Sequence, residues 1–378
     1  MSTAIDAFVT VELAADVPDA SARMARRFEG CDLAHVAVFA SPSVDLASVM
    51  KDFSPRAGCP VSACTTAGEL GSDGYVENRI LALGFPAARF VTRSIFIENL
   101  GDIDSEALAR RVAAERVALA GEAAGRENGF ALLLVDGLSL REDMLVAALA
   151  PGLGKMPLVG GSAGDGERFE RTFVALDGAC RQDAAVLTLV KTDLEVAAFS
   201  IDDVQPTETR MVVTAADPRR RVVREINGRP AALELARIAN LPPGPIEEFA
   251  FAAYPTVVRI GSRTHVRAIN RVTPEGHLVF FSAIDEGLVL TLARSGDLVR
   301  HLDASLTEIT RGGAAVGVLA CDCILRRIEA RRGQRSRAVS ELLSRHRVRG
   351  FSTYGEQTGG MHLNATLTGV ALFTSAAP

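Results

Sequence analysis

Tryptophan is absent, tyrosine occurs only three times in 378 residues, and the sequence shows no array of aromatic residues suited to stacking on bases. Proteins that bind single-stranded nucleic acid combine such stacking platforms with a positively charged groove. The formal net charge is −5, so the total charge does not favour nucleic acid either. We therefore expect no nucleic-acid partner.

Long apolar runs are also missing. No stretch approaches the roughly 20 apolar residues that a membrane-spanning helix needs. The opening residues MSTAIDAFVTVEL lack the basic region and apolar core of a secretion signal. The sequence thus predicts a cytoplasmic protein with no membrane association.

The six cysteines form neither a disulfide framework nor a zinc-binding pattern. Only Cys321 and Cys323 are close neighbours, and a zinc site would need two further ligands at recognisable spacing. We expect these two residues to be buried, reduced thiols without a chemical role.

What the sequence does contain is a globular composition, with 48% hydrophobic and 23% charged residues. Short extended runs alternate with helical segments along the whole chain, which predicts an α/β (α+β) fold, a two-lobed layered sandwich of mixed β-sheets with outer helices. Asp217-Pro218 and the four arginines that follow interrupt this pattern. We therefore predict two domains, residues 1–215 and 221–378.

A short pattern recurs three times: a small polar residue, any residue, glycine and a carboxylate, each time at the end of an extended run. The three tetrapeptides are Thr66-Ala67-Gly68-Glu69, Ser162-Ala163-Gly164-Asp165 and Thr353-Tyr354-Gly355-Glu356. Glycine permits a bend that a β-carbon would obstruct, and the acid can accept bonds from backbone N–H groups freed there. This recurrence suggests an internal repeat of layered sheets with helices outside.

The segment from Arg326 to Arg349 carries nine arginines against two glutamates. We predict a single basic helix over residues 324–346. Its positive face is either simply solvated or a docking face for an acidic partner or phosphate groups.

The C-terminal stretch 350–373 reads as strand, turn and strand. In the second strand, predicted over 361–373, the side chains of His362, Asn364 and Thr366 alternate with apolar ones. A histidine therefore leads a polar row in a segment that otherwise resembles core.

The chain resembles the FIST-domain sensory proteins. The resemblance rests on CTTAGELGSDGY and VGGSAGDG in the first half, and on INGRPAALEL, VRAINRVTPEGHLVFFSAIDEG, Tyr354-Gly355-Glu356 and Asn364-Ala365-Thr366 in the second. The Met361-His362 pair is similar to the NosP-type branch, haem proteins that sense nitric oxide. This chain has Ala365 where that branch commonly has glutamine.

The resemblance implies a sensor rather than an enzyme, with haem b bound non-covalently, because Cys-x-x-Cys-His is absent. His362 would be the axial iron ligand, with Met361, Asn364 and Tyr354 beside it. The arginines at four-residue spacing, of which Arg267 and Arg271 are the main candidates beside Arg259 and Arg263, would bind the propionates. Nitric oxide would be the signal and a sensor histidine kinase the partner. A homo-oligomer is compatible with this reading.

Several alternatives stay open. His265, His277 or His301 could be the ligand instead of His362. The chain could be a FIST sensor of a non-haem small ligand, an amino acid or other metabolite, held by the four tetrapeptide side chains Thr66, Ser162, Thr353 and Tyr354. A hydrolase using the acidic trio Glu69, Asp165 and Glu356 is a further hypothesis.

Overall fold

Three six-stranded sheets with the same internal order form the core of the part of the chain that the structure describes. The structure is a computed structural model that describes residues 6–241, 254–261 and 263–374. In each sheet the order runs from an edge strand through an antiparallel neighbour and a parallel pair to a two-stranded hairpin. The chain thus repeats one β/α unit three times, and the predicted mixed α/β layering is confirmed.

The helices and strands follow one another in a similar order in each repeat. The first repeat contains β1 (Val9–Ala14), α1 (Ala20–Phe28), β2 (Leu33–Ala40), α2 (Leu46–Ala57), β3 (Val61–Thr65), β4 (Glu69–Gly71), β5 (Gly74–Val76) and β6 (Arg79–Pro86). The second contains β7 (Phe90–Glu98), η1 (Leu100–Asp102), α3 (Ser105–Glu122), β8 (Asn128–Val135), α4 (Glu142–Leu153), β9 (Leu158–Ser162), β10 (Val174–Leu176), β11 (Ala179–Arg181) and β12 (Ala184–Thr192). The third contains β13 (Glu195–Ile201), α6 (Leu298–Ile309), β22 (Gly317–Cys323), α7 (Ile324–Arg332), α8 (Ser336–Arg345), β23 (Val348–Thr353), β24 (Glu356–Thr358), β25 (Met361–Leu363) and β26 (Leu367–Phe373).

The repeats exchange their hairpins in a ring. The hairpin β4–β5 of the first repeat pairs with β23 of the third, β24–β25 of the third pairs with β9 of the second, and β10–β11 of the second pairs with β3 of the first. Each exchanged hairpin follows one of the three recurring tetrapeptides: β4 and β24 begin at its acid, Glu69 or Glu356, and β10 begins at Val174, farther along the chain from Asp165. The tetrapeptides therefore direct the chain from its own sheet into the next.

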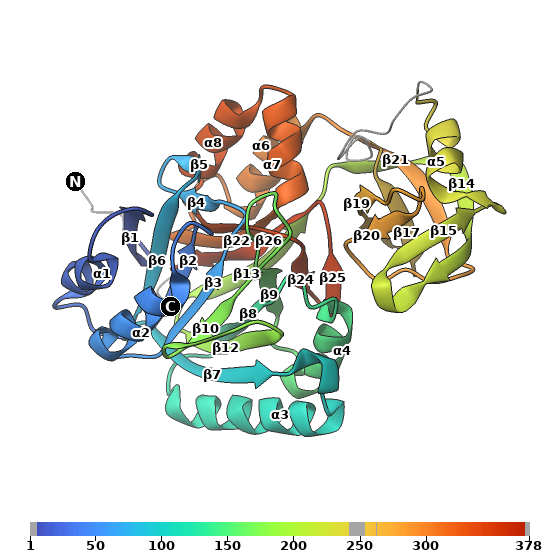
Figure 1. The fold of residues 1–378 in the computed structure, drawn as a ribbon. Helices are drawn as coiled ribbons and strands as arrows, with labels where there is room; N and C mark the ends of the chain where they lie inside the picture. The colour runs from blue at the N-terminus through green and yellow to red at the C-terminus, as the bar shows by residue number, and fades with distance from the viewer. Residues whose placement is uncertain (1–5, 242–253, 262, 375–378) are drawn as a thin grey trace.

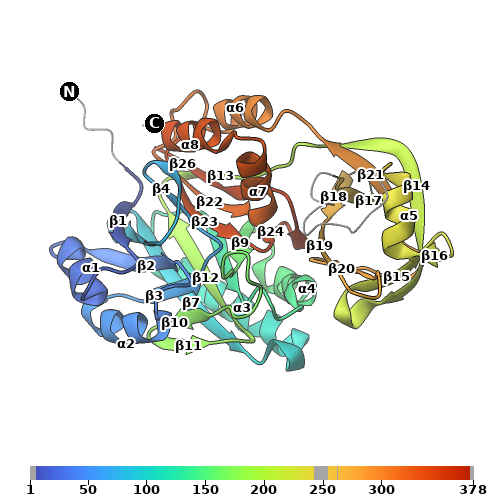
Figure 2. The same ribbon diagram turned by 45° about the horizontal axis from the view of Figure 1, so that its top comes forward.

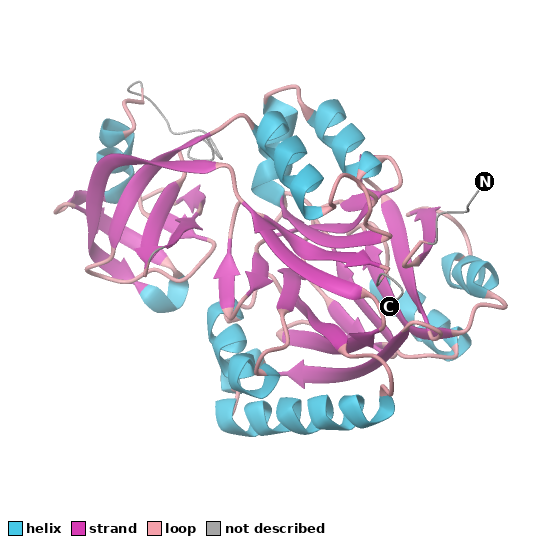
Figure 3. Cartoon of the chain, turned by 180° about the vertical axis from the view of Figure 1, so that it is seen from behind, coloured by secondary structure: helices cyan, strands magenta, loops and turns pink. Residues whose placement is uncertain are grey.

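The inner faces of the three sheets share one apolar core, in which Phe39 of β2 and Phe351 of β23 stack with ring centroids 4.6 Å apart. Each outer face packs against its own helices: α1 and α2, then α3 and α4, then α6 and α8. Figure 3 shows these helices on the outside of the core. Strands buried on both faces explain the nearly continuous apolar runs of the sequence.

An inserted lobe, residues 204–295, interrupts the third repeat between β13 and α6. It contains β14 (Val204–Asp217), η2 (Pro218–Arg220), β15 (Val222–Ile226), β16 (Arg229–Pro230), α5 (Ala231–Ile238), β17 (Thr256–Ile260), β18 (Arg263–Arg267), β19 (Ile269–Val272), β20 (Leu278–Phe280) and β21 (Val289–Ser295). Figures 1 and 2 show this lobe, coloured yellow to orange, beside α7, β24 and α4 of the core.

The predicted division into residues 1–215 and 221–378 falls within the antiparallel pair β14–β15 of the inserted lobe. Strands from both sides of this division share sheets, because β13 pairs with β26 and β4 pairs with β23. That residues 1–215 and 221–378 act as two functional units stays a prediction.

Two local predictions are wrong. The expected single helix over 324–346 is two helices, because the chain turns at Gly333, the C-cap of α7, and Gln334 adopts a φ of 56°. The expected strand over 361–373 is also two, because Ala365 has a φ of 54° and sends β25 and β26 into different sheets. Both sides of that segment are buried, so it has no polar face toward open space.

In the described ranges, no helix combines the length and the apolar character needed to cross a membrane.

Candidate functional site

His362 lies in the exchanged hairpin β24–β25, with only 2% of its surface exposed. The amide nitrogen of Gln357 lies 3.1 Å from its Nδ1, so Nδ1 accepts a hydrogen bond and Nε2 carries the proton. Nε2 has no hydrogen-bond partner. Burial lowers the pKa of His362; the carboxylates of Glu142 and Asp143 oppose this shift. The imidazole is therefore a neutral ring in a closed environment.

The inserted lobe covers this region of the core. Ser282 of the lobe donates a hydrogen bond to Asn364 Oδ1. The side chain of Arg221 is buried and pairs with Glu142 at 2.7 Å and Asp143 at 3.1 Å, both at the start of α4. The rings of Phe169, Tyr354 and Phe281 form one cluster, with Phe169 at centroid distances of 4.4 Å from Tyr354 and 5.7 Å from Phe281.

These surroundings do not fit a haem. The ring of His362 packs against Gly355 so closely that a β-carbon there would lie 2.2 Å from Cε1 and 2.8 Å from Nε2. None of the cavities of about 380 to 430 Å³ found among the described residues is lined by His362. The unpartnered Nε2 is buried and borders none of these cavities, so this packing leaves no room for a porphyrin beside it.

The other residues predicted for a haem site are partly brought together. His362 and Asn364 both approach Gly355, and Asn364 Nδ2 is 3.5 Å from the carbonyl oxygen of the preceding Tyr354. Met361 is half-buried on β25 with His362. Arg267 is half-buried on β18, and its charge contributes to lowering the pKa of His362. Arg271 is exposed on β19.

The remaining candidates are dispersed. Arg259 is exposed, and the side chain of Arg263 lies outside the described residues. The alternative histidines lie on β18 (His265), before β20 (His277) and on α6 (His301). In the described part of the chain, no three histidine, cysteine or acidic side chains are grouped so that they could hold a metal ion.

The tetrapeptides form their own hydrogen-bonded turns. The hydroxyl of Thr66 donates to Glu69 at 2.6 Å, and that of Thr353 donates to Glu356 in the same way. Burial raises the pKa of Glu69 to about 7 and that of Glu356 to about 8. The predicted polar pocket of Thr66, Ser162, Thr353 and Tyr354 is therefore wrong, because these side chains bond inward and are buried.

The second tetrapeptide differs in detail. Asp165 accepts hydrogen bonds from the backbone N–H groups of residues 169, 170 and 171 at 2.8 to 2.9 Å, and from the hydroxyl of Tyr354. The three acids thus stabilise turns.

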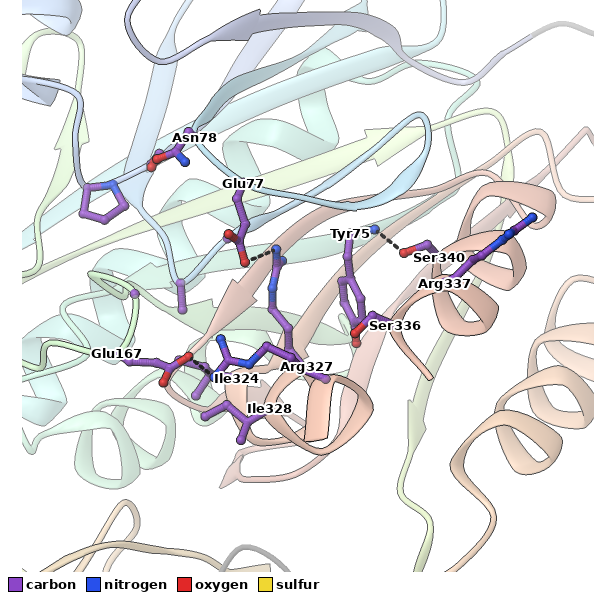
Figure 4. A pocket seen from close by; sticks show the side chains of 16 residues that line it. Tyr75, Glu77, Asn78, Glu167, Ile324, Arg327, Ile328, Ser336, Arg337 and Ser340 are labelled. Carbon is purple, nitrogen blue, oxygen red and sulfur yellow. Dashed lines mark hydrogen bonds and ion pairs between the residues drawn. The ribbon is translucent and has the colours of Figure 1, made fainter. Parts of the chain in front are cut away.

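A cavity of about 430 Å³ opens where the first tetrapeptide and the two residues after the second tetrapeptide, Gly166 and Glu167, meet α7 and α8 (Figure 4). Its lining consists of Ser41, Pro42, Ala67, Gly68, Tyr75, Glu77, Asn78, Gly166, Glu167, Ile324, Arg327, Ile328, Arg331, Ser336, Arg337 and Ser340. Both signs of charge line this cavity together with several hydroxyl groups. It is therefore suited to a small polar ligand that carries charge.

Arg327 is held in place at the wall of this cavity. One guanidinium nitrogen donates to the Val76 carbonyl oxygen at 2.8 Å and the other lies 3.3 Å from Ser352 Oγ, while the group stacks over the ring of Tyr75 at 4.8 Å. Among the described residues, Arg327 forms an ion pair with Glu77, at 3.2 Å, and the Glu77 side chain is 66% exposed. The guanidinium is thus held in place by neutral groups of the protein, whereas its counter-ion is largely exposed to solvent.

Sequence reasoning missed this site because it treated the arginine-rich segment as one surface. The arginines of this segment differ in exposure: the side chain of Arg326 is 2% exposed and that of Arg327 is 11% exposed, whereas that of Arg337 on α8 is 93% exposed. The available signal was the i, i+4 spacing of Arg327 and Arg331, which places both on one helix face.

Comparison with known protein families gives two matches. The model of the FIST N domain matches residues 34–229, and that of the FIST C domain matches residues 231–358. Among curated proteins, no sequence matches this chain.

Proposed function

We propose that this chain, which belongs to the FIST-domain family of signalling sensory domains, senses a small amphoteric ligand such as an amino acid or a related metabolite in the Arg327 cavity. The proposal involves binding without turnover. The cytoplasmic location expected from the sequence is part of it.

The observation that carries the proposal is the fixed guanidinium of Arg327 at the wall of a cavity of about 430 Å³. Arginine presents two parallel N–H groups to a carboxylate, and a guanidinium already held in place loses little freedom on binding. A ligand carboxylate would replace the exposed Glu77 as its counter-ion.

The same cavity offers carboxylates to a cationic group. Glu77 becomes available once it leaves Arg327, and Glu167, paired with Arg331 at 2.6 Å, lies on another part of the lining. The hydroxyl groups of Ser41, Ser336 and Ser340 add neutral donors and acceptors. A molecule with both a carboxylate and an ammonium group therefore matches the lining better than a simple anion.

Thermal unfolding in the presence of each proteinogenic amino acid in turn tests this proposal. Because a ligand that binds only the folded state raises its stability, at least one amino acid should raise the melting temperature. Titration calorimetry should then show weaker binding, by about tenfold or more, in Arg327→Met. Binding should be unchanged in Arg345→Met, because Arg345 is an exposed arginine of α8 outside the cavity lining. Equal affinity in Arg327→Met and wild type would overturn the proposal.

The haem hypothesis is a separate proposal that rests on the sequence resemblance; the packing around His362 would have to open to admit a porphyrin. Its test is the absorption spectrum of the protein mixed with haemin, with and without nitric oxide. A Soret band that shifts with nitric oxide in wild type and is altered in His362→Ala would support it. A spectrum equal to that of free haemin, or one unchanged by the substitution, would remove it.

A signalling sensory domain acts on another protein, and the resemblance noted above makes a sensor histidine kinase the expected partner. Co-purification of the chain with a candidate kinase, and kinase activity with and without the bound amino acid, would test this.

A further inference from the structure

Helix α7 lies between the Arg327 cavity and the inserted lobe. The cavity is lined by four α7 residues on one helix face, namely Ile324, Arg327, Ile328 and Arg331. The neighbouring face of the helix, Leu325, Arg326 and Glu329, lines a small gap toward the lobe, together with Val204, Pro255, Val266, Ala268, Ile269 and Ser295. One helix therefore contacts both the cavity and the lobe.

A buried polar network passes beside this helix from the cavity wall to the lobe. The hydroxyl of Tyr75, a residue of the cavity lining, donates to Asp322 Oδ2. Arg326 Nε donates to Asp322 Oδ1 at 2.8 Å. Arg326 Nη1 lies 3.7 Å from Asp203 Oδ1, and all three of these charged side chains are at most 3% exposed.

Asp203 lies where the chain enters the inserted lobe. The strand β13 ends at residue 201 and β14 begins at residue 204, so Asp203 belongs to the first connection. Its carbonyl oxygen accepts a hydrogen bond from the backbone N–H of Gly296 at 2.8 Å, which belongs to the returning connection. The network thus ends at the point where both connections to the lobe meet.

The network is incompletely satisfied. Two carboxylates, those of Asp203 and Asp322, share the single guanidinium of Arg326. Asp203 Oδ2 and Arg326 Nη1 both lack a hydrogen-bond partner, and a buried polar atom without a partner costs free energy. The bond of Arg326 to Asp322 is the closer one, so the contact with Asp203 is the weaker side of the network.

We infer that this network makes the attachment of the inserted lobe depend on the state of the Arg327 cavity, an inference that rests on the proposed function. When a ligand draws the Tyr75 hydroxyl away from Asp322, this carboxylate loses a donor and competes more strongly for Arg326. The contact between Arg326 and Asp203 then weakens, and the lobe connection loosens. Ligand binding is thereby converted into a change in the position or mobility of the lobe.

Hydrogen exchange in the full chain tests the coupling without any ligand. In Tyr75→Phe, peptides covering Gly296 and β21 should exchange faster by about tenfold, although neither is in contact with residue 75. Asp203→Asn should accelerate exchange of these peptides to a similar extent. In the double variant, the exchange rate should be less than about twofold above that of the faster single variant, because both substitutions act on one network. Ser344→Ala, which removes the hydrogen bond from α8 to the Ser72 carbonyl oxygen outside the cavity lining, should leave exchange unchanged.

Exchange of the buried strand β8 shows in the same samples whether the core stays folded. Two outcomes would overturn the inference. One is a double variant in which the rate increases of Tyr75→Phe and Asp203→Asn multiply, and the other is a Tyr75→Phe protein whose exchange at Gly296 equals that of wild type.

The amino acid with the largest thermal shift should accelerate exchange at Gly296 in wild type but not in Tyr75→Phe. If no amino acid binds, the proposed function fails while the coupling measured between variants stands. If an amino acid binds and exchange is unaltered, the coupling fails and the proposed function stands.

Discussion

Gly68 and Arg327 lie so close that a β-carbon on residue 68 would be 2.4 Å from Arg327 Nη1. Gly68 has a φ of +121°, and it belongs to the first tetrapeptide, far from α7 in sequence. The glycine of that turn therefore provides the space in which the guanidinium of the cavity is held.

We predict that Gly68→Ala destabilises the protein, because it combines a disfavoured backbone conformation with displacement of Arg327. The free energy of unfolding, measured with urea, should fall by about 1–3 kcal/mol. Gly166→Ala is the matched control, because Gly166 lines the same cavity with a φ of +74° but has nothing within 4 Å of its added β-carbon. Equal losses in the two variants would show that Arg327 is not constrained by Gly68.

The stability of the protein should fall as the pH rises, because of the buried acids Glu69 and Glu356. Burial raises the pKa of Glu356 from 4.5 to about 8, so the folded state keeps a proton that the unfolded chain releases. The stabilisation from this proton is complete below pH 4.5 and is lost as the pH rises through about 8. For each pH unit within this window, the loss is about 1.4 kcal/mol.

Urea unfolding at several pH values measures this dependence. Glu356→Gln keeps the shape of the side chain without its titration, so its stability should depend less on pH than that of wild type, the remaining slope coming from Glu69. An unaltered slope in this variant would contradict the assignment to Glu356.

We expect Arg221→Ala to detach the inserted lobe from the core. The substitution leaves Glu142 buried without its cation, and breaking such a buried pair costs about 3–5 kcal/mol. Arg110→Ala is the control, because its ion pair with Glu106 is exposed at both side chains and should contribute less than about 1 kcal/mol. Chemical denaturation reports both losses, and a loss in Arg221→Ala no larger than in the control would contradict the docking role.

Gly355→Ala should disturb the hairpin that carries His362. Its β-carbon would lie 2.2 Å from the imidazole, and forcing extra volume into a packed site costs about 1–3 kcal/mol. Gly101→Ala, with nothing within 4 Å, should have little effect. The comparison is made by thermal unfolding. A Gly355→Ala protein as stable as wild type would show that the ring of His362 has room to move.

Much of the local structure could be predicted from the sequence because it depends on neighbouring residues. The apolar run 130–135 is the buried strand β8, and the alanine-rich segment from residue 105 is helix α3. The three tetrapeptides indicated an internal repeat, because each turn needs its own glycine and acid.

What only the tertiary structure decided is which distant segments meet. Strand pairing is non-local, so no pattern in the sequence shows that β4 pairs with β23 or that β24 pairs with β9. For the same reason, Arg327 could not be distinguished from its exposed neighbours until Gly68 and Tyr75 of the first repeat were placed beside it. The sequence determined the repeated units and their turns, and the exchange of hairpins between them decided where the cavity lies.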